Sequence, residues 1–401
     1  MKNKFIYLAI IAAGFASCEP EFENEVGANY TAGDADFSSY VAIGNSLTAG
    51  YMDGTVYKSG QANSFPNLLA QQFALVGGGT FTQPSFEEDV NNLGGFAGVP
   101  NSTRRIIDAS TGTVENIAGT PTITTTSQAT AYNNMGVPGA KSFHLGFPGY
   151  GTLNPYFARH ATSPTATVIG DAMSKNPTFF TNWIGANDVL SYATNGGAQA
   201  DGTTPAADHN LTGNMNPATY GSNDITNSGV FASVYSTLIS TLTSGGAKGV
   251  VATVPSVTSI PYFTTVPYKP VPLDNTFATQ LNSAYAAYNG GLDVAFSNGL
   301  ITNAERLQRK VVFVAGKNPV VIVDSDLTNL SGLGLPSYRM TTSQDLIVLP
   351  ASSFIGTTVG GDPLMINGVS VPLANKWVLT ANEQAKVASA TAAYNNTIVS
   401  I

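Results

Sequence analysis

The segment 40–50, with the sequence YVAIGNSLTAG, constrains the fold of this chain more than any other. Its first four residues are apolar and partly β-branched, which is typical of a central strand in a parallel sheet. Gly44 and Gly50 flank a polar corner and permit a tight backbone path on either side. We therefore expect a buried strand that ends abruptly and lifts Ser46 out at the carboxyl edge of the sheet, where open α/β sheets bind ligands. The alternative is an ordinary strand-to-helix loop in which Ser46 caps the helix.

Helix patterns alternate with strand patterns along the rest of the chain, which favours an α/β fold with a mostly parallel sheet. Residues 77–131 and 194–226 are rich in Gly, Thr and Asn, and we expect them to be loop-rich insertions. The patterns predict helices over 64–75, 166–173, 230–242, 277–288 and 380–401, and strands over 249–255, 310–314, 319–323 and 346–350.

Two further glycine-containing corners accompany the first one. They are NMGVPGA at 134–140 and WIGAND at 183–188. The order Gly-Asn-Ser-Leu, Gly-Val-Pro-Gly and Gly-x-Asn-Asp resembles the SGNH/GDSL hydrolases. The resemblance implies a three-layer α/β/α domain in which Ser46 is the nucleophile. It also implies an oxyanion hole formed by the N–H of Ser46, the N–H of Gly139 and the side-chain amide of Asn187.

The reaction implied by this resemblance is hydrolysis of an ester bond through an acyl-enzyme on Ser46, with a small or polymeric ester as substrate. No cofactor and no metal are expected. The chain contains one Cys and three scattered His, which do not form a zinc site, and Asp324 with Asp326 is weak evidence for a cation. It has no Gly-x-Ser-x-Gly, Gly-x-Gly-x-x-Gly or P-loop motif.

A general base is missing from the expected place. The family carries it as the His of an Asp-x-x-His block near the C-terminus, and no such block occurs in the 401 residues. A Ser hydroxyl is a poor nucleophile without a base. Three explanations stay open: the sequence stops before this block, the chain is an inactive relative that binds glycans or lipids, or His144 or His160 replaces the base. The uncapped end of the last predicted helix favours the first.

The neighbouring residues Asp208 and His209 are a further acid/base candidate. Adjacent side chains in an extended chain point in opposite directions, so these two are not expected to bond each other. We interpret them as part of a solvated loop.

The N-terminus predicts export. Residues 1–17 have a charged start and a short apolar core, as in a secretory signal. The sequence FASC before and including Cys18 resembles a bacterial lipobox, so Cys18 would carry the lipid that attaches the protein to a membrane. An acidic tether over 18–36, similar to the export signals of Bacteroidetes surface lipoproteins, would precede the hydrolase-like domain over 37–401, which we expect to lack its C-terminal end. The expected location is the outer membrane or cell surface.

The charge of the chain agrees with this location. Its formal net charge is −8, and the only basic cluster is Arg104-Arg105, so a nucleic-acid partner is not expected.

Overall fold

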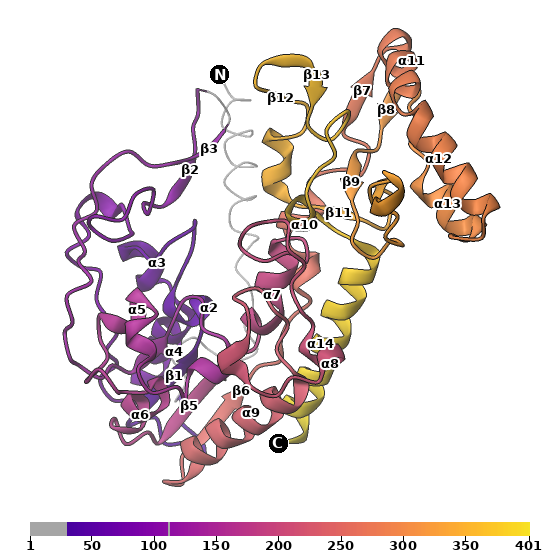
Figure 1. The fold of residues 1–401 in the computed structure, drawn as a ribbon. Helices are drawn as coiled ribbons and strands as arrows, with labels where there is room; N and C mark the ends of the chain where they lie inside the picture. Colours follow the sequence, from indigo (N-terminus) through magenta and orange to yellow (C-terminus); the bar gives the residue numbers. More distant parts are fainter. Residues whose placement is uncertain (1–29, 111–112) are drawn as a thin grey trace, which may run out of the picture.

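The computed structural model describes residues 30–110 and 113–401. The first part of the chain contains a parallel sheet of four strands (Figure 1), in the order β4-β1-β5-β6. The strands are β1 (Tyr40–Gly44), β4 (Asn134–Gly136), β5 (Phe179–Trp183) and β6 (Lys248–Val251). Because all four are parallel, their carboxyl ends lie on one edge of the sheet, as the pattern of residues 40–50 predicts.

The side chains of β1 alternate between two clusters, since successive residues of a strand point to opposite faces. Tyr40 and Ala42 pack in one cluster with α4 (Phe65–Ala74). Val41 and Ile43 belong to the main core, which also contains residues of α6 (Val168–Met173). β1 is therefore buried on both faces, and this explains its continuous apolar sequence.

Most of the predicted helices are confirmed. Helix α4 covers the prediction over 64–75, α6 the one over 166–173, α9 (Ser228–Thr243) the one over 230–242 and α14 (Ala381–Ser400) the one over 380–401. The prediction over 277–288 corresponds to two consecutive helices, α11 (Asn275–Ala284) and α12 (Ala286–Ser297).

The strand predictions were less accurate. Residues 319–323 and 346–350 contain only the short strands β9 (Val321–Val323) and β11 (Leu346–Ile347). The strand predicted over 310–314 is absent. Its backbone is bonded by side-chain amides instead: Asn289 bonds both the N–H and the C=O of Val311, and Asn282 does the same for Phe313. Two asparagines on neighbouring helices thus take the place of a partner strand.

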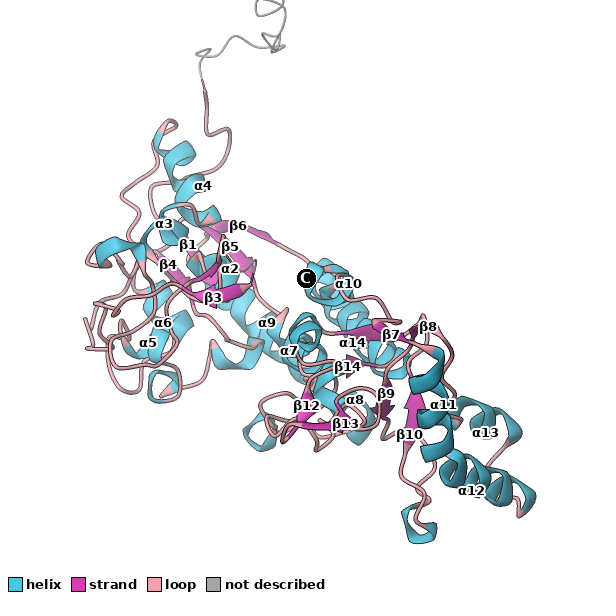
Figure 2. Ribbon diagram, turned by 90° about the horizontal axis from the view of Figure 1, so that it is seen from above, coloured by secondary structure: helices cyan, strands magenta, loops and turns pink. Residues whose placement is uncertain are grey.

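A second region, residues 257–380, is built from antiparallel strand pairs that the sequence patterns did not indicate (Figure 2). These pairs are β7 (Val271–Leu273) with β8 (Gly316–Asn318), β9 with β10 (Tyr338–Met340), β11 with β14 (Val378–Leu379), and β12 (Thr358–Val359) with β13 (Asp362–Ile366). Its helices include α10 (Pro261–Thr264) and α13 (Asn303–Arg309). Helix α14 then returns to pack along α7 (Asn187–Thr194) and α9 (Figure 1).

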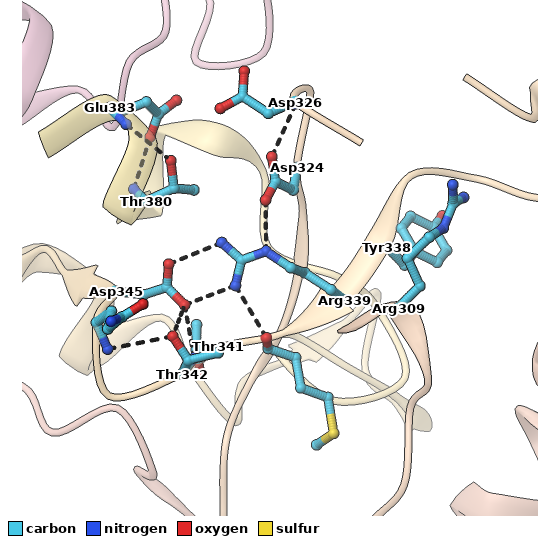
Figure 3. A network of polar contacts seen from close by, with 12 residues as sticks. Arg309, Asp324, Asp326, Tyr338, Arg339, Thr341, Thr342, Asp345, Thr380 and Glu383 are labelled. Atoms are coloured by element: carbon cyan, nitrogen blue, oxygen red, sulfur yellow. Dashed lines mark hydrogen bonds and ion pairs between the residues drawn. The ribbon is translucent and has the colours of Figure 1, made fainter. Parts of the chain in front are cut away.

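A buried ion-pair network stabilises this second region (Figure 3). Arg339 on β10 donates from Nε to Asp324 at 2.5 Å and from Nη1 to Asp345 at 2.7 Å. Asp324, one of the two acids considered for a cation, is therefore paired with a guanidinium. No group of three or more His, Cys, Asp or Glu within residues 30–110 and 113–401 is arranged to hold a metal ion.

The predictions for the N-terminus fall largely on residues that the structure does not describe. The signal over 1–17, Cys18 and most of the tether over 18–36 precede residue 30. Within the described part of the chain, no helix has the length and apolar character needed to cross a membrane. The insertion predicted over 77–131 is loop-rich, with one small strand pair, β2 (Arg105–Ile107) and β3 (Val114–Asn116).

Candidate functional site

Ser46 lies at the corner between β1 and the short helix α2 (Ser46–Ala49), as the sequence predicts. The residue that caps this helix is Asn45, whose Oδ1 accepts a hydrogen bond from the N–H of Leu47 at 3.1 Å. The alternative role of Ser46 as a helix cap is thus wrong. As the first residue of the helix, Ser46 has a backbone N–H without an intrahelical acceptor. Its side chain is partly exposed, and no hydrogen bond to its Oγ occurs among the described residues.

Glycine is required at the start of this corner. A Cβ on Gly44 would collide with the side chain of Thr48 and would lie 2.6 Å from the carbonyl oxygen of Trp183. The absence of a side chain therefore lets α2 fold back tightly over the end of β1. This close approach places Ser46 at the edge of the sheet.

Gly139 lies in the loop after β4, next to the same corner. In the pairing of β1 with β4, Gly44 lies opposite Gly136, and the N–H of Val137 donates to the carbonyl of Gly44 at 3.0 Å. Gly139 has a φ of +79°, which favours glycine, and it is exposed. Its N–H has no hydrogen-bond partner within the described part of the chain. We name residues 137–142 the oxyanion loop, after the role that the sequence predicts for Gly139.

Asn187 and Asp188, the first two residues of α7, fix the oxyanion loop from the side of β5. The Nδ2 of Asn187 donates to the carbonyl of Ala140 at 2.9 Å. The carboxylate of Asp188 accepts from the N–H of Ser142 at 2.9 Å and from its Oγ at 2.8 Å. One N–H of the Asn187 amide thus holds the loop, and the side chain is buried.

The environment of Asp188 shows how closely this junction is packed. Its side chain is completely buried, and burial raises the pKa of the carboxyl group, while the bonds from Ser142 and the charge of Lys141 act in the opposite direction. Each oxygen that bonds Ser142 is thus protected from water, and the loop is held by more than one contact.

Ser46, Gly139 and Asn187 follow β1, β4 and β5, which are neighbours in the sheet. The structure therefore brings the three predicted residues to one edge. Among the described residues, neither the backbone N–H of Ser46 nor that of Gly139 donates a hydrogen bond within the protein, and the amide of Asn187 donates to Ala140. Such a set can stabilise the negative charge that develops on a carbonyl oxygen under attack.

None of the three histidines hydrogen-bonds Ser46 in the described part of the chain. His160, one of the predicted substitute bases, is 1% exposed, and burial lowers its pKa to about 3. It borders a cavity of about 20 Å³, together with Ala49 and Pro138. A cavity of this size holds about one water molecule.

The interpretation of Asp208 and His209 as part of a solvated loop is wrong. Both are buried, and Asp208 caps the short helix α8 (His209–Thr212). The Nε2 of His209 lies 2.9 Å from Asp224, and its Nδ1 lies 2.9 Å from the Oγ1 of Thr212. The polar composition of 194–226 is typical of an exposed loop, and no spacing in the sequence indicates the pair with Asp224.

Asp224 also connects this buried pair to the oxyanion loop. Its backbone carbonyl accepts from the Nζ of Lys141 at 2.7 Å. Burial raises the pKa of its carboxyl group, but donors that include the N–H groups of Ala207 and Gly221 lower it by more, so the pKa lies below its usual value. Lys141, next to Ser142, is buried as well, and desolvation lowers the pKa of its ammonium group.

A much larger cavity lies elsewhere. It has a volume of about 820 Å³ and is lined by mostly apolar residues of α12 and of the segment 333–338. Helix α12 belongs to the second region and lies far from α2 (Figure 1). This cavity is therefore separate from the edge that carries Ser46.

Comparisons of the chain with protein-family models, with curated proteins and with solved structures find no match.

Proposed function

We propose that this chain is a serine ester hydrolase of the SGNH/GDSL type, with a three-layer α/β/α core. The observation that carries the proposal is the arrangement of Ser46, Gly139 and Asn187 after three adjacent parallel strands. Their N–H groups are available at one edge, and Asn187 and Asp188 hold the loop that contains Gly139. Helices on both faces of β1 agree with the layered core.

The proposed reaction begins when the Oγ of Ser46 attacks the carbonyl carbon of an ester. The carbonyl oxygen becomes an oxyanion, which accepts hydrogen bonds from the N–H groups of Ser46 and Gly139 and from the second N–H of Asn187. The C–O bond to the alcohol then breaks, and the alcohol leaves with a proton. Water releases the acid from Ser46 in a second step of the same kind.

The proton of Ser46 needs an acceptor, and this step decides between two functions. His160 is buried away from solvent, and both ring nitrogens of His209 are already bonded. Since no histidine of the described residues contacts Ser46, a binding protein that holds an ester or glycan without cleaving it is the second candidate. In the absence of a base, the hole and the binding of substrate give a residual acceleration of about 10³–10⁴ over water.

Hydrolysis of a short-chain ester separates the two candidates. We expect the full chain to release 4-nitrophenol from 4-nitrophenyl acetate above the background rate, and Ser46→Ala to remove this activity. Ser236→Ala, on the exposed face of α9, is the matched control. Equal rates for the wild type and Ser46→Ala would reject the hydrolase and leave the binding protein.

We also propose that the protein acts at the cell surface, attached through a lipid on Cys18. This proposal is supported by the sequence of residues 1–36. Mass spectrometry of the N-terminal peptide from the native host tests it, because a diacylated Cys18 is expected as the first residue. A peptide that begins elsewhere with an unmodified Cys18 would reject the anchor.

A further inference from the structure

His144 has a fixed orientation at the end of the oxyanion loop. Its Nδ1 accepts a hydrogen bond from the backbone N–H of Lys141 at 3.1 Å. Its ring stacks on Tyr150, with 4.5 Å between the ring centroids and 13° between the planes. The ring of Phe143 meets it edge-on at 4.4 Å. Two aromatic contacts and a backbone bond thus leave the imidazole little freedom to rotate.

The bond to Lys141 also determines the tautomer of this ring. A backbone N–H is only a donor, so the Nδ1 that it meets must offer a lone pair, and a neutral imidazole then carries its proton on Nε2. Burial, followed by the nearby charge of Lys141, lowers the pKa of His144 to about 4. Near neutral pH the ring is therefore uncharged, and its Nε2 is a donor.

Contacts of Tyr150 connect the ring of His144 to the oxyanion loop. The Nδ2 of Asn154 bonds the hydroxyl of Tyr150 at 3.0 Å and the carbonyl of Pro138 at 2.9 Å. The same nitrogen lies 3.9 Å from the position that a Cβ on Gly139 would occupy. His144, Tyr150 and Asn154 therefore form a short chain of contacts that ends at the oxyanion loop. The Nε2 of His144 has no hydrogen-bond partner in the described residues, and the side chain is partly exposed.

We propose that His144 binds substrate through its Nε2–H, which donates a hydrogen bond to a neutral oxygen of the ester next to the reacting carbonyl. The inference rests on the proposed function, and it replaces the expectation that His144 serves as a base. An uncharged donor offers no ion pair to a carboxylate, so the substrate it selects is an uncharged ester with additional hydroxyl, ether or carbonyl oxygens, such as an acylated polyol.

The tautomer is measured first, because it does not depend on activity. The chain contains three histidines, so a long-range ¹H–¹⁵N spectrum is simple, and loss of one set of signals in His144→Gln assigns the residue. We expect an unprotonated Nδ1 and a protonated Nε2, without titration between pH 5.5 and 9. A protonated Nδ1, or a titration midpoint near 6.5, would overturn the proposal.

The substrate contact is measured with two variants. His144→Phe keeps an aromatic ring on Tyr150 but lacks the donor, and His144→Gln restores an N–H. For glucose pentaacetate we expect His144→Phe to raise KM about tenfold, because one hydrogen bond to the substrate is lost. His144→Gln should bring KM most of the way back to the wild-type value. For 4-nitrophenyl acetate, which has few additional oxygens, KM stays within about twofold of the wild type. Equal losses on both esters would show a purely structural role.

A third measurement separates failure of this inference from failure of the proposed function. If the wild type does not cleave esters, glucose pentaacetate is titrated into the ¹⁵N-labelled protein. A shift of the His144 Nε2 signal that is absent for methyl acetate supports the contact even in a binding protein. An unchanged His144 signal at saturation of the protein, or no binding at all, overturns it.

Discussion

Asp188 accepts two hydrogen bonds from Ser142, one from its backbone N–H at 2.9 Å and one from its Oγ at 2.8 Å, in a completely buried position. The adjacent Asn187 holds the carbonyl of Ala140. Two consecutive residues of α7 thus fix two residues of the oxyanion loop, and the position of Gly139 depends on both. The loop is held by polar contacts to α7, so weakening these contacts is expected to affect stability and reactivity together.

Ser142→Ala tests this clamp. The substitution removes the Oγ and leaves one buried carboxylate oxygen of Asp188 without its donor. Leaving a buried polar atom without its hydrogen-bond partner costs about 1–3 kcal/mol, so we expect the free energy of unfolding to fall by about that amount. Urea unfolding measures the change. Ser236→Ala on the exposed face of α9 is expected to stay within about 0.5 kcal/mol of the wild type. Equal stability of Ser142→Ala and the control would contradict the clamp.

The buried carboxyl group of Glu383 is expected to make the free energy of unfolding depend on pH. Its side chain is 6% exposed and lies near Thr380 (Figure 3). Burial raises its pKa to about 7; hydrogen bonds with Thr380 lower the pKa, and the charges of Asp324 and Asp326 raise it further. The folded state therefore binds the proton more tightly than the unfolded state, whose pKa lies near 4.5. The stabilisation is complete below about pH 4.5, decreases as the pH rises toward 7, and does not decrease further above it.

Glu383→Gln is expected to remove this dependence, because its amide oxygen can still accept from the N–H of Thr380 and carries no charge. Between pH 4.5 and 8 the wild type should lose on the order of 2–3 kcal/mol more than the variant. Chemical denaturation at several pH values measures this. The exposed Glu87→Gln is the control and should follow the wild type. Parallel curves for the wild type and Glu383→Gln would show that Glu383 is ionised throughout this range.

Arg339 is the centre of the second region, and its removal leaves Asp324 and Asp345 as buried carboxylates without a counter-charge (Figure 3). We expect Arg339→Ala to lower the free energy of unfolding by about 3–5 kcal/mol. Arg306→Ala breaks a pair with Asp293, which is 47% exposed, and is expected to cost less than about 1 kcal/mol. Similar midpoints of thermal unfolding for the two variants would contradict the importance of the buried network.

The sequence is informative where a local pattern determines the structure. The strand and corner over 40–50 follow from four apolar residues and a polar turn flanked by glycines, and the start of α14 follows from the capping box of Thr380 and Glu383. The edge that carries the candidate site could be predicted for the same reason, since three strands end in short glycine-containing corners. The resemblance placed Ser46, Gly139 and Asn187 on that edge.

The remaining structure depends on contacts between distant residues, which no local pattern reveals. The segment 310–314 has the composition of a strand, but Asn282 and Asn289 bond its backbone from helices that lie about 20 to 30 residues earlier. The polar residues His209 and Asp224 are buried in a segment of polar composition, and they bond each other inside the protein. Composition alone does not distinguish a buried polar network from a solvated loop.

Reaction of Ser46 with a fluorophosphonate probe tests the central claim most directly, because Oγ displaces fluoride from phosphorus and the adduct places its polar phosphoryl oxygen at the proposed oxyanion hole. We predict a single adduct, located on Ser46 by mass spectrometry and absent from Ser46→Ala. In Asn187→Ala the adduct should form about 10²–10³ times more slowly, the usual effect of losing one oxyanion donor. An unmodified Ser46 in the wild type, or Asn187→Ala that reacts at the wild-type rate, would contradict the assignment of this edge as an ester-hydrolysing site.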